Sequence, residues 1–128
     1  MKKGWTLVEL VVVVIFIAVL AMLGMIQYNR MIEKGRTAEA RAVLSLIRSA
    51  EHAYKQQYGN FTSVLELLGV ENLVTSCAST HFYYYRVAID KGVATRCTVS
   101  GKYPNAAGAY SITITHDLGD IGGDAPYY

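Results

Sequence analysis

The distribution of hydrophobic and polar side chains divides the chain into an apolar N-terminal segment and a mixed remainder. Residues 5–26, WTLVELVVVVIFIAVLAMLGMI, contain a single charged side chain, Glu9. As an α-helix this segment would span about 33 Å at about 1.5 Å per residue, close to the hydrocarbon thickness of a bilayer. A helix also satisfies its own backbone hydrogen bonds in lipid. The pattern therefore predicts a membrane-crossing helix.

Helical periodicity continues beyond the apolar segment, but with one apolar stripe instead of a uniformly apolar surface. The opposite face is polar and includes Glu51 and His52. Because no proline interrupts the pattern, we expect one helix over residues 5–58, ended by Gly59. The predicted stripe consists of Val43, Leu46, Ile47, Ala50, Ala53, Tyr54 and Tyr58.

The C-terminal half shows the composition and alternation of β-strands. Residues 81–89 are rich in aromatic and β-branched side chains, and residues 93–99 return after a predicted turn at residues 90–92. Residues 110–115 alternate apolar and hydroxyl-bearing side chains, as in a strand with one buried face. The simplest arrangement is a meander of three antiparallel strands packed on the stripe of the long helix. The predicted fold class is therefore α+β.

The connecting segments carry shorter signals. Residues 63–66, Ser-Val-Leu-Glu, match the capping-box pattern and predict a short helix over residues 64–68 with Gly69 as its stop. Residues 70–80 and 102–108 are expected to form loops. The tail beyond residue 116 is rich in glycine and aspartate.

Three interpretations of the apolar segment compete. A secretory signal peptide has an apolar core of about 7–15 residues and a small-residue cleavage site, and the apolar run here is longer. A plain membrane anchor fits the length but leaves Glu9 unexplained, because a carboxylate in hydrocarbon costs about 2.5–3.5 kcal/mol. The third interpretation supplies a partner for that carboxylate.

Residues 1–10, MKKGWTLVEL, closely resemble the N-terminus of type IV pilin precursors, the prepilins and pseudopilins. The shared pattern is a short basic leader ending in glycine, an aromatic residue, Thr-Leu-x-Glu and a long apolar helix. The resemblance implies that a prepilin peptidase cleaves between Gly4 and Trp5 and methylates the new amine of Trp5. It also implies that Glu9 pairs with the N-terminal amine of a neighbouring subunit during filament assembly. Pairing of Glu9 with its own amine remains an alternative.

The two cysteines, Cys77 and Cys97, lie beyond the predicted anchor. Lys2 and Lys3 favour a cytoplasmic N-terminus, so the cysteines would face an oxidising compartment, where a disulfide is expected. The alternative is two independent buried thiols. A bridge closing a loop of about 20 residues would stabilise the fold by about 3 kcal/mol.

Charge and composition give little support for enzymatic or nucleic-acid-binding functions. Without Lys2 and Lys3 the chain has ten basic and ten acidic side chains, so no electrostatic argument favours nucleic acid. The three histidines show neither metal-ligand spacing nor a Ser-His-Asp pattern, and we expect no catalytic residue, metal site or cofactor. Asp117, Asp120 and Asp124 do not follow the EF-hand spacing, so a solvated acidic loop is favoured over a calcium site.

The sequence therefore predicts a leader over residues 1–4, an apolar polymerisation helix over residues 5–28 and a globular head over residues 29–128. The expected function is that of a structural subunit of a type IV pilus-like filament. Its expected partners are further copies of itself, a prepilin peptidase and an inner-membrane assembly platform, with the membrane holding the precursor before a surface filament forms. The alternatives are a pseudopilin of a type II secretion system and a membrane-anchored binding module that does not polymerise.

Overall fold

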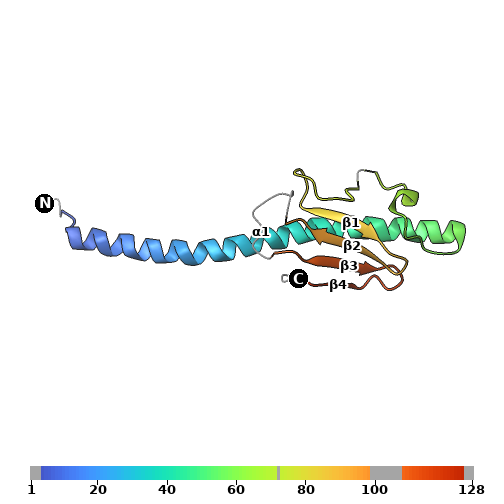
Figure 1. Cartoon of the computed structure of the whole chain (residues 1–128). Helices are drawn as coiled ribbons and strands as arrows, with labels where there is room; N and C mark the ends of the chain where they lie inside the picture. Colours follow the sequence, from blue (N-terminus) through green and yellow to red (C-terminus); the bar gives the residue numbers. More distant parts are fainter. Residues whose placement is uncertain (1–3, 72, 99–107, 126–128) are drawn as a thin grey trace. The chain divides into compact units, whose positions relative to one another are not determined.

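The computed structural model describes residues 4–71, 73–98 and 108–125, and in this part of the chain a long helix is combined with a small antiparallel sheet (Figure 1). This confirms the predicted α+β fold class. Residues 102–107 of the predicted second loop and residue 99 of the predicted second strand lie outside the described residues. The elements are α1 (Leu7–Tyr58), the 3-10 helix η1 (Leu65–Leu68), β1 (Tyr83–Val87), β2 (Lys91–Arg96), β3 (Ser111–Thr115) and β4 (Ile121–Gly123).

Helix α1 is continuous over 52 residues, as the uninterrupted helical pattern predicts. Its C-terminus follows the expected glycine mechanism, because Gly59 has a φ of 87° and its amide donates to the carbonyl of Lys55 at 2.8 Å. A residue with a side chain rarely adopts this left-handed conformation. The helix therefore ends at Tyr58.

The chain separates into two compact units between Ile32 and Glu33, four residues beyond the boundary expected from hydropathy. In the N-terminal unit, every side chain from residue 7 to residue 31 is exposed. This part of α1 is long and apolar enough to cross a membrane. Its exposed apolar surface is compatible with membrane anchoring.

The C-terminal unit contains the sheet, whose strand order is β1-β2-β3-β4 with every neighbouring pair antiparallel. The turn predicted at residues 90–92 begins one residue earlier and ends two residues earlier than expected. Ala88 and Lys91 exchange backbone hydrogen bonds, so Ile89 and Asp90 form the turn. Gly92 instead lies within β2, where an added Cβ would be 3.3 Å from Leu44 Cδ2. The glycine permits close helix–sheet contact here and does not form the turn.

Strand β4 lies in the glycine-rich tail and was not among the three predicted strands. Gly122 pairs with Thr113 and Gly123 with Ile112. A Cβ on Gly123, whose φ is 116°, would lie 2.2 Å from the carbonyl oxygen of Ser111. Glycine is therefore required for this pairing, but glycines also remove the side-chain alternation by which a strand is recognised.

The core lies between α1 and the inner face of the sheet, but the buried face of the helix is rotated from the predicted stripe. Leu46 and Tyr58 are exposed, whereas Glu51, expected on the polar face, is 0% exposed. In its buried position Oε2 accepts a hydrogen bond from the amide of Thr62 at 3.1 Å, whereas Oε1 has no partner among the described residues. The buried residues of α1 are Glu33, Thr37, Ala40, Leu44, Ile47 and Glu51.

The predicted short helix is present as η1, but the predicted cap is wrong. Val64 occupies the N-cap position without a side-chain hydrogen bond, and the hydroxyl of Thr62 accepts from the amide of Val64 at 3.1 Å. Thr62 therefore orders this segment in place of Ser63. Gly69 ends η1 in the left-handed conformation, as predicted.

Candidate functional site

The predicted cleavage position lies in an open, non-helical segment before α1. Gly4, Trp5 and Thr6 have no helical or strand structure, and all three are exposed. No heavy atom would lie within 4 Å of a Cβ added to Gly4. The bond between Gly4 and Trp5 is therefore accessible in this structure, as a peptidase substrate requires.

Thr6 and Glu9 together cap the start of α1. The amide of Glu9 donates to Thr6 Oγ1 at 3.3 Å, and the Thr6 hydroxyl donates to Glu9 Oε2 at 3.5 Å. The Thr-x-x-Glu spacing of a capping box was available in the sequence as a signal for this contact. Glu9 thus lies in the first helical turn, where the unpaired amides of a helix favour negative charge.

Within residues 4–71, 73–98 and 108–125, Glu9 forms no ion pair. Its carboxylate is exposed and is followed by the long apolar surface of the N-terminal unit. The arrangement is a single acid at one end of an apolar helix. It leaves the carboxylate able to accept a cation from outside the described residues.

The sequence did not predict that Glu33 is one of the buried charged groups of the head. Its exposed fraction is 1%. Its Oε1 accepts hydrogen bonds from Arg96 Nε at 2.7 Å and from the Tyr110 hydroxyl at 2.8 Å. Its Oε2 accepts from Arg36 Nη1 at 2.9 Å. We call these four residues the Glu33 network.

The electrostatics of the Glu33 network favour an ionised carboxylate. Burial alone would raise the pKa of Glu33, but hydrogen bonds from Arg96 and Tyr110, together with the positive charge of Arg96, lower it below its ordinary value. Burial, with hydrogen bonds to Tyr83 and Glu33, raises the pKa of Tyr110. Tyr110 therefore remains a neutral donor to an anionic acceptor, which is a strong form of hydrogen bond.

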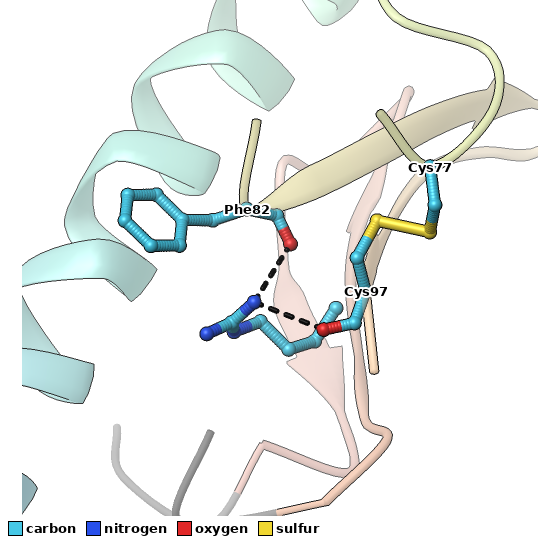
Figure 2. Close-up of a disulfide and its surroundings, with 4 residues drawn as sticks. Cys77, Phe82 and Cys97 are labelled. Carbon is cyan, nitrogen blue, oxygen red and sulfur yellow. Dashed lines mark hydrogen bonds between the residues drawn. A yellow bond between two sulfur atoms is a disulfide. The ribbon is translucent and has the colours of Figure 1, made fainter. Parts of the chain in front are cut away.

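The Cys77–Cys97 disulfide is present and adjoins this network (Figure 2). Cys97 directly follows β2, one residue beyond the strand in which it was expected. Arg96 Nη1 donates to the carbonyls of Phe82 at 3.1 Å and Cys97 at 3.0 Å. These bonds are the dashed lines in Figure 2. One arginine side chain thus connects the backbone at the disulfide and at the start of β1 to a carboxylate on α1.

The histidines of the helix and sheet contribute to packing at the other end of the head. His52 was expected on the polar face, but its Nε2 lies 2.8 Å from the carbonyl oxygen of His116, which also accepts from Arg48 Nε at 2.9 Å. His116 itself is fully buried, with Nε2 3.0 Å from the carbonyl oxygen of Ala88. These contacts connect α1 to the two turns of the sheet.

The acidic residues of the tail have separate partners. Asp117 Oδ1 lies 3.2 Å from Lys55 Nζ, and Asp124 Oδ2 accepts from the Ser111 hydroxyl at 3.3 Å. Lys55 therefore pairs with Asp117 across the fold. In the described segments, no group of three or more His, Cys, Asp or Glu side chains is arranged to hold a metal ion.

No family model and no curated protein matches this chain. The functional assignment therefore depends on the residues and geometry of the chain itself.

Proposed function

We propose that this protein is a structural subunit of a type IV pilus-like filament, assembled through its N-terminal helix after removal of a short leader. The observation that carries the proposal is the position of Glu9. It is the only charge of a long apolar segment, it lies in the first turn of an exposed helix, and it follows the Gly4–Trp5 bond by one helical turn.

The proposed sequence of events begins with the precursor in the inner membrane, where Lys2 and Lys3 remain on the cytoplasmic side. A prepilin peptidase hydrolyses the Gly4–Trp5 bond, and the new amine of Trp5 becomes methylated. An assembly platform then transfers the subunit into a helical bundle of identical chains. The protein performs no chemistry on a substrate in this scheme.

Pairing of charges gives the assembly step a physical basis. The amine of Trp5 on one subunit and the carboxylate of Glu9 on its neighbour would both be costly to bury alone, and much less costly to bury together. A pair of this kind also favours one axial register between two otherwise uniform apolar helices.

The proposal is tested by comparing surface filaments with membrane-held subunit at equal expression for Glu9→Ala and Glu9→Leu. Both variants are expected to insert normally, because they remove a charge from the apolar segment, and to yield few or no filaments. Asp120→Ala is the matched control, since it removes an exposed acid of the head. Normal filament yield from both Glu9 variants would contradict the proposal and favour a membrane-anchored protein that does not polymerise.

A further inference from the structure

The head contains a small cavity of about 200 Å³ between α1, the segment before β1 and β1 itself. All of its lining residues belong to the C-terminal unit. A volume of this size corresponds to about six or seven waters. It is below the range of about 300–1,000 Å³ typical of pockets for drug-sized ligands. The cavity is therefore suited to a small molecule or to the end of a side chain.

The walls of the cavity are apolar and aromatic, whereas its rim is acidic. Val43, Leu73, Val74 and Tyr85 are partly or fully buried lining residues. Glu39, Glu71 and His81 are exposed and line the same space, and the two carboxylates are the charged groups among the three when the histidine is neutral. A ligand that matches both features has a short apolar chain and a positive charge.

The two carboxylates are not neutralised by the part of the chain that the structure describes. Neither Glu39 nor Glu71 forms an ion pair or side-chain hydrogen bond there. Arg36 and Arg96 lie over the ring of Phe82, another lining residue. The guanidinium group of Arg36 is 4.2 Å from the Phe82 ring centroid and pairs with Glu33. The acidic rim thus remains open to a further cation.

Tyr85 contributes a polar group to the same cavity. Its side chain is an inward-facing residue of β1 and only 7% exposed, yet its hydroxyl makes no hydrogen bond with any described residue. The oxygen of this hydroxyl is not enclosed by protein, so it is open to the cavity that Tyr85 lines. The neighbouring ring, Tyr83, differs in this respect, since its hydroxyl pairs with that of Tyr110 at 2.5 Å.

The charge of Glu39 also acts on this phenol. Burial and, secondarily, the carboxylate of Glu39 raise the pKa of Tyr85 to about 12. The phenol therefore stays neutral at physiological pH. Its oxygen remains a hydrogen-bond acceptor close to a negative charge.

We propose that this cavity binds an alkylammonium cation, with the apolar stem against Val43 and Leu73 and the ammonium group held by Glu39, Glu71 and the hydroxyl of Tyr85. An ammonium group donates three hydrogen bonds, which matches two carboxylates and one phenol oxygen. The aromatic ring adds a favourable interaction with the cation. The cation has two possible sources, a free amine or a lysine side chain of a second copy of this chain. The proposal does not depend on filament formation.

The direct test is NMR titration of the full-length protein, labelled on tyrosine rings and held in non-ionic detergent, with n-butylammonium chloride. We expect saturable shifts of the Tyr85 signals, and none with n-butanol, which has the same stem without the charge. Glu39→Gln should weaken binding by at least about tenfold, equivalent to the loss of one charged contact. Tyr85→Phe should weaken it by about two- to tenfold, because it removes one hydrogen bond and keeps the ring.

Asp120→Asn is the control, because it removes an exposed acid outside the cavity and should leave the titration unchanged. Circular dichroism of each variant establishes that the fold is retained. A carbodiimide reaction on assembled or concentrated protein distinguishes the second source, since a lysine of another copy would form an intermolecular amide with Glu39 or Glu71. Saturable amine binding that depends on Glu39 supports a free amine, and the specific cross-link supports a second copy. The absence of both would overturn the proposal.

Discussion

Neutralising Glu33 is expected to destabilise the head more than neutralising any exposed acid. Glu33→Gln keeps the shape of the side chain, but it leaves the guanidinium group of Arg96, which is 0% exposed, without its counter-charge. The carbonyls of Phe82 and Cys97, which also accept hydrogen bonds from Arg96, are neutral and do not replace that charge. Removing one partner of a buried ion pair typically costs about 3–5 kcal/mol.

The structure favours the lower end of that range. Gln retains an acceptor at the Oε1 position for Arg96 and Tyr110, but it places an amide donor or a weaker acceptor opposite Arg36. The Arg36 side chain is 15% exposed, so water compensates part of its loss. We therefore expect a loss of about 3 kcal/mol in the free energy of unfolding. For a domain of this size this corresponds to a decrease of about 12–24 °C in Tm.

The assay is thermal and denaturant unfolding of the full-length protein in detergent, followed by near-ultraviolet circular dichroism of the aromatic side chains. Glu66→Gln is the matched control, since it makes the same chemical change at an exposed acid of η1 and should alter stability by less than about 0.5 kcal/mol. Combining Glu33→Gln with Arg96→Met should cost less than the sum of the single changes. A single-variant loss below about 0.5 kcal/mol, or strict additivity, would refute the importance assigned to the pair.

Three further outcomes are expected. Intact-mass analysis of the mature protein should show loss of Met1 to Gly4 and one added methyl group, and Gly4→Val should leave an unprocessed membrane protein; a mature chain that begins at Met1 would contradict the assignment. Thiol labelling of the unfolded, unreduced protein should find no free cysteine, and Cys97→Ala should lower stability by about 3 kcal/mol. Because the pKa of Glu33 is lowered on folding, its contribution to stability is present above its ordinary value of 4.5 and is lost as pH falls through the lowered pKa. Glu33→Gln should therefore reduce the loss of stability at acidic pH. An unchanged stability–pH profile would show that other carboxylates cause this loss.

The features predicted correctly from the sequence are those with local signals. The length of α1 follows from helical periodicity without proline and from the glycine after Tyr58. The burial of Tyr110, Ile112 and Ile114 follows from the alternation around β3. Each of these signals lies within a few residues of the structure that it specifies, so sequence pattern alone is sufficient.

The errors concern interactions between distant segments. Glu33 and Arg96 are 63 positions apart, and each alone has the pattern of an exposed charge. Glu51 was wrongly placed on the polar face. Its partner is the backbone amide of Thr62, and a backbone amide has no sequence signature. Gly92 of β2 was assigned to a turn, and the glycines of β4 gave no strand signal, although close packing and strand pairing require them. The burial of these polar side chains and the close contacts at these glycines therefore depend on the tertiary structure, not on the local sequence.

Glu9 and Glu33 lie on the same helix but differ in the donors available to them. Glu33 receives three side-chain hydrogen bonds, whereas Glu9, among the described residues, receives only one long hydrogen bond, from the hydroxyl of Thr6. In water this difference matters little for an exposed carboxylate. In lipid or in a packed helix bundle, one neutral donor does not offset the cost of removing the charge from water. The missing partner has to come from outside the described contacts of Glu9.

Cleavage after Gly4 would create such a partner, because it converts the amide nitrogen of Trp5 into an amine one helical turn from Glu9. Before cleavage no positive charge exists at that position, because the nitrogen of Trp5 is part of the peptide bond to Gly4. Processing and assembly would then depend on the same charge pair. A chain with Gly4→Val should therefore resemble one with Glu9→Ala, with subunits held in the membrane and filaments absent. Filaments built from uncleaved subunits would contradict this coupling.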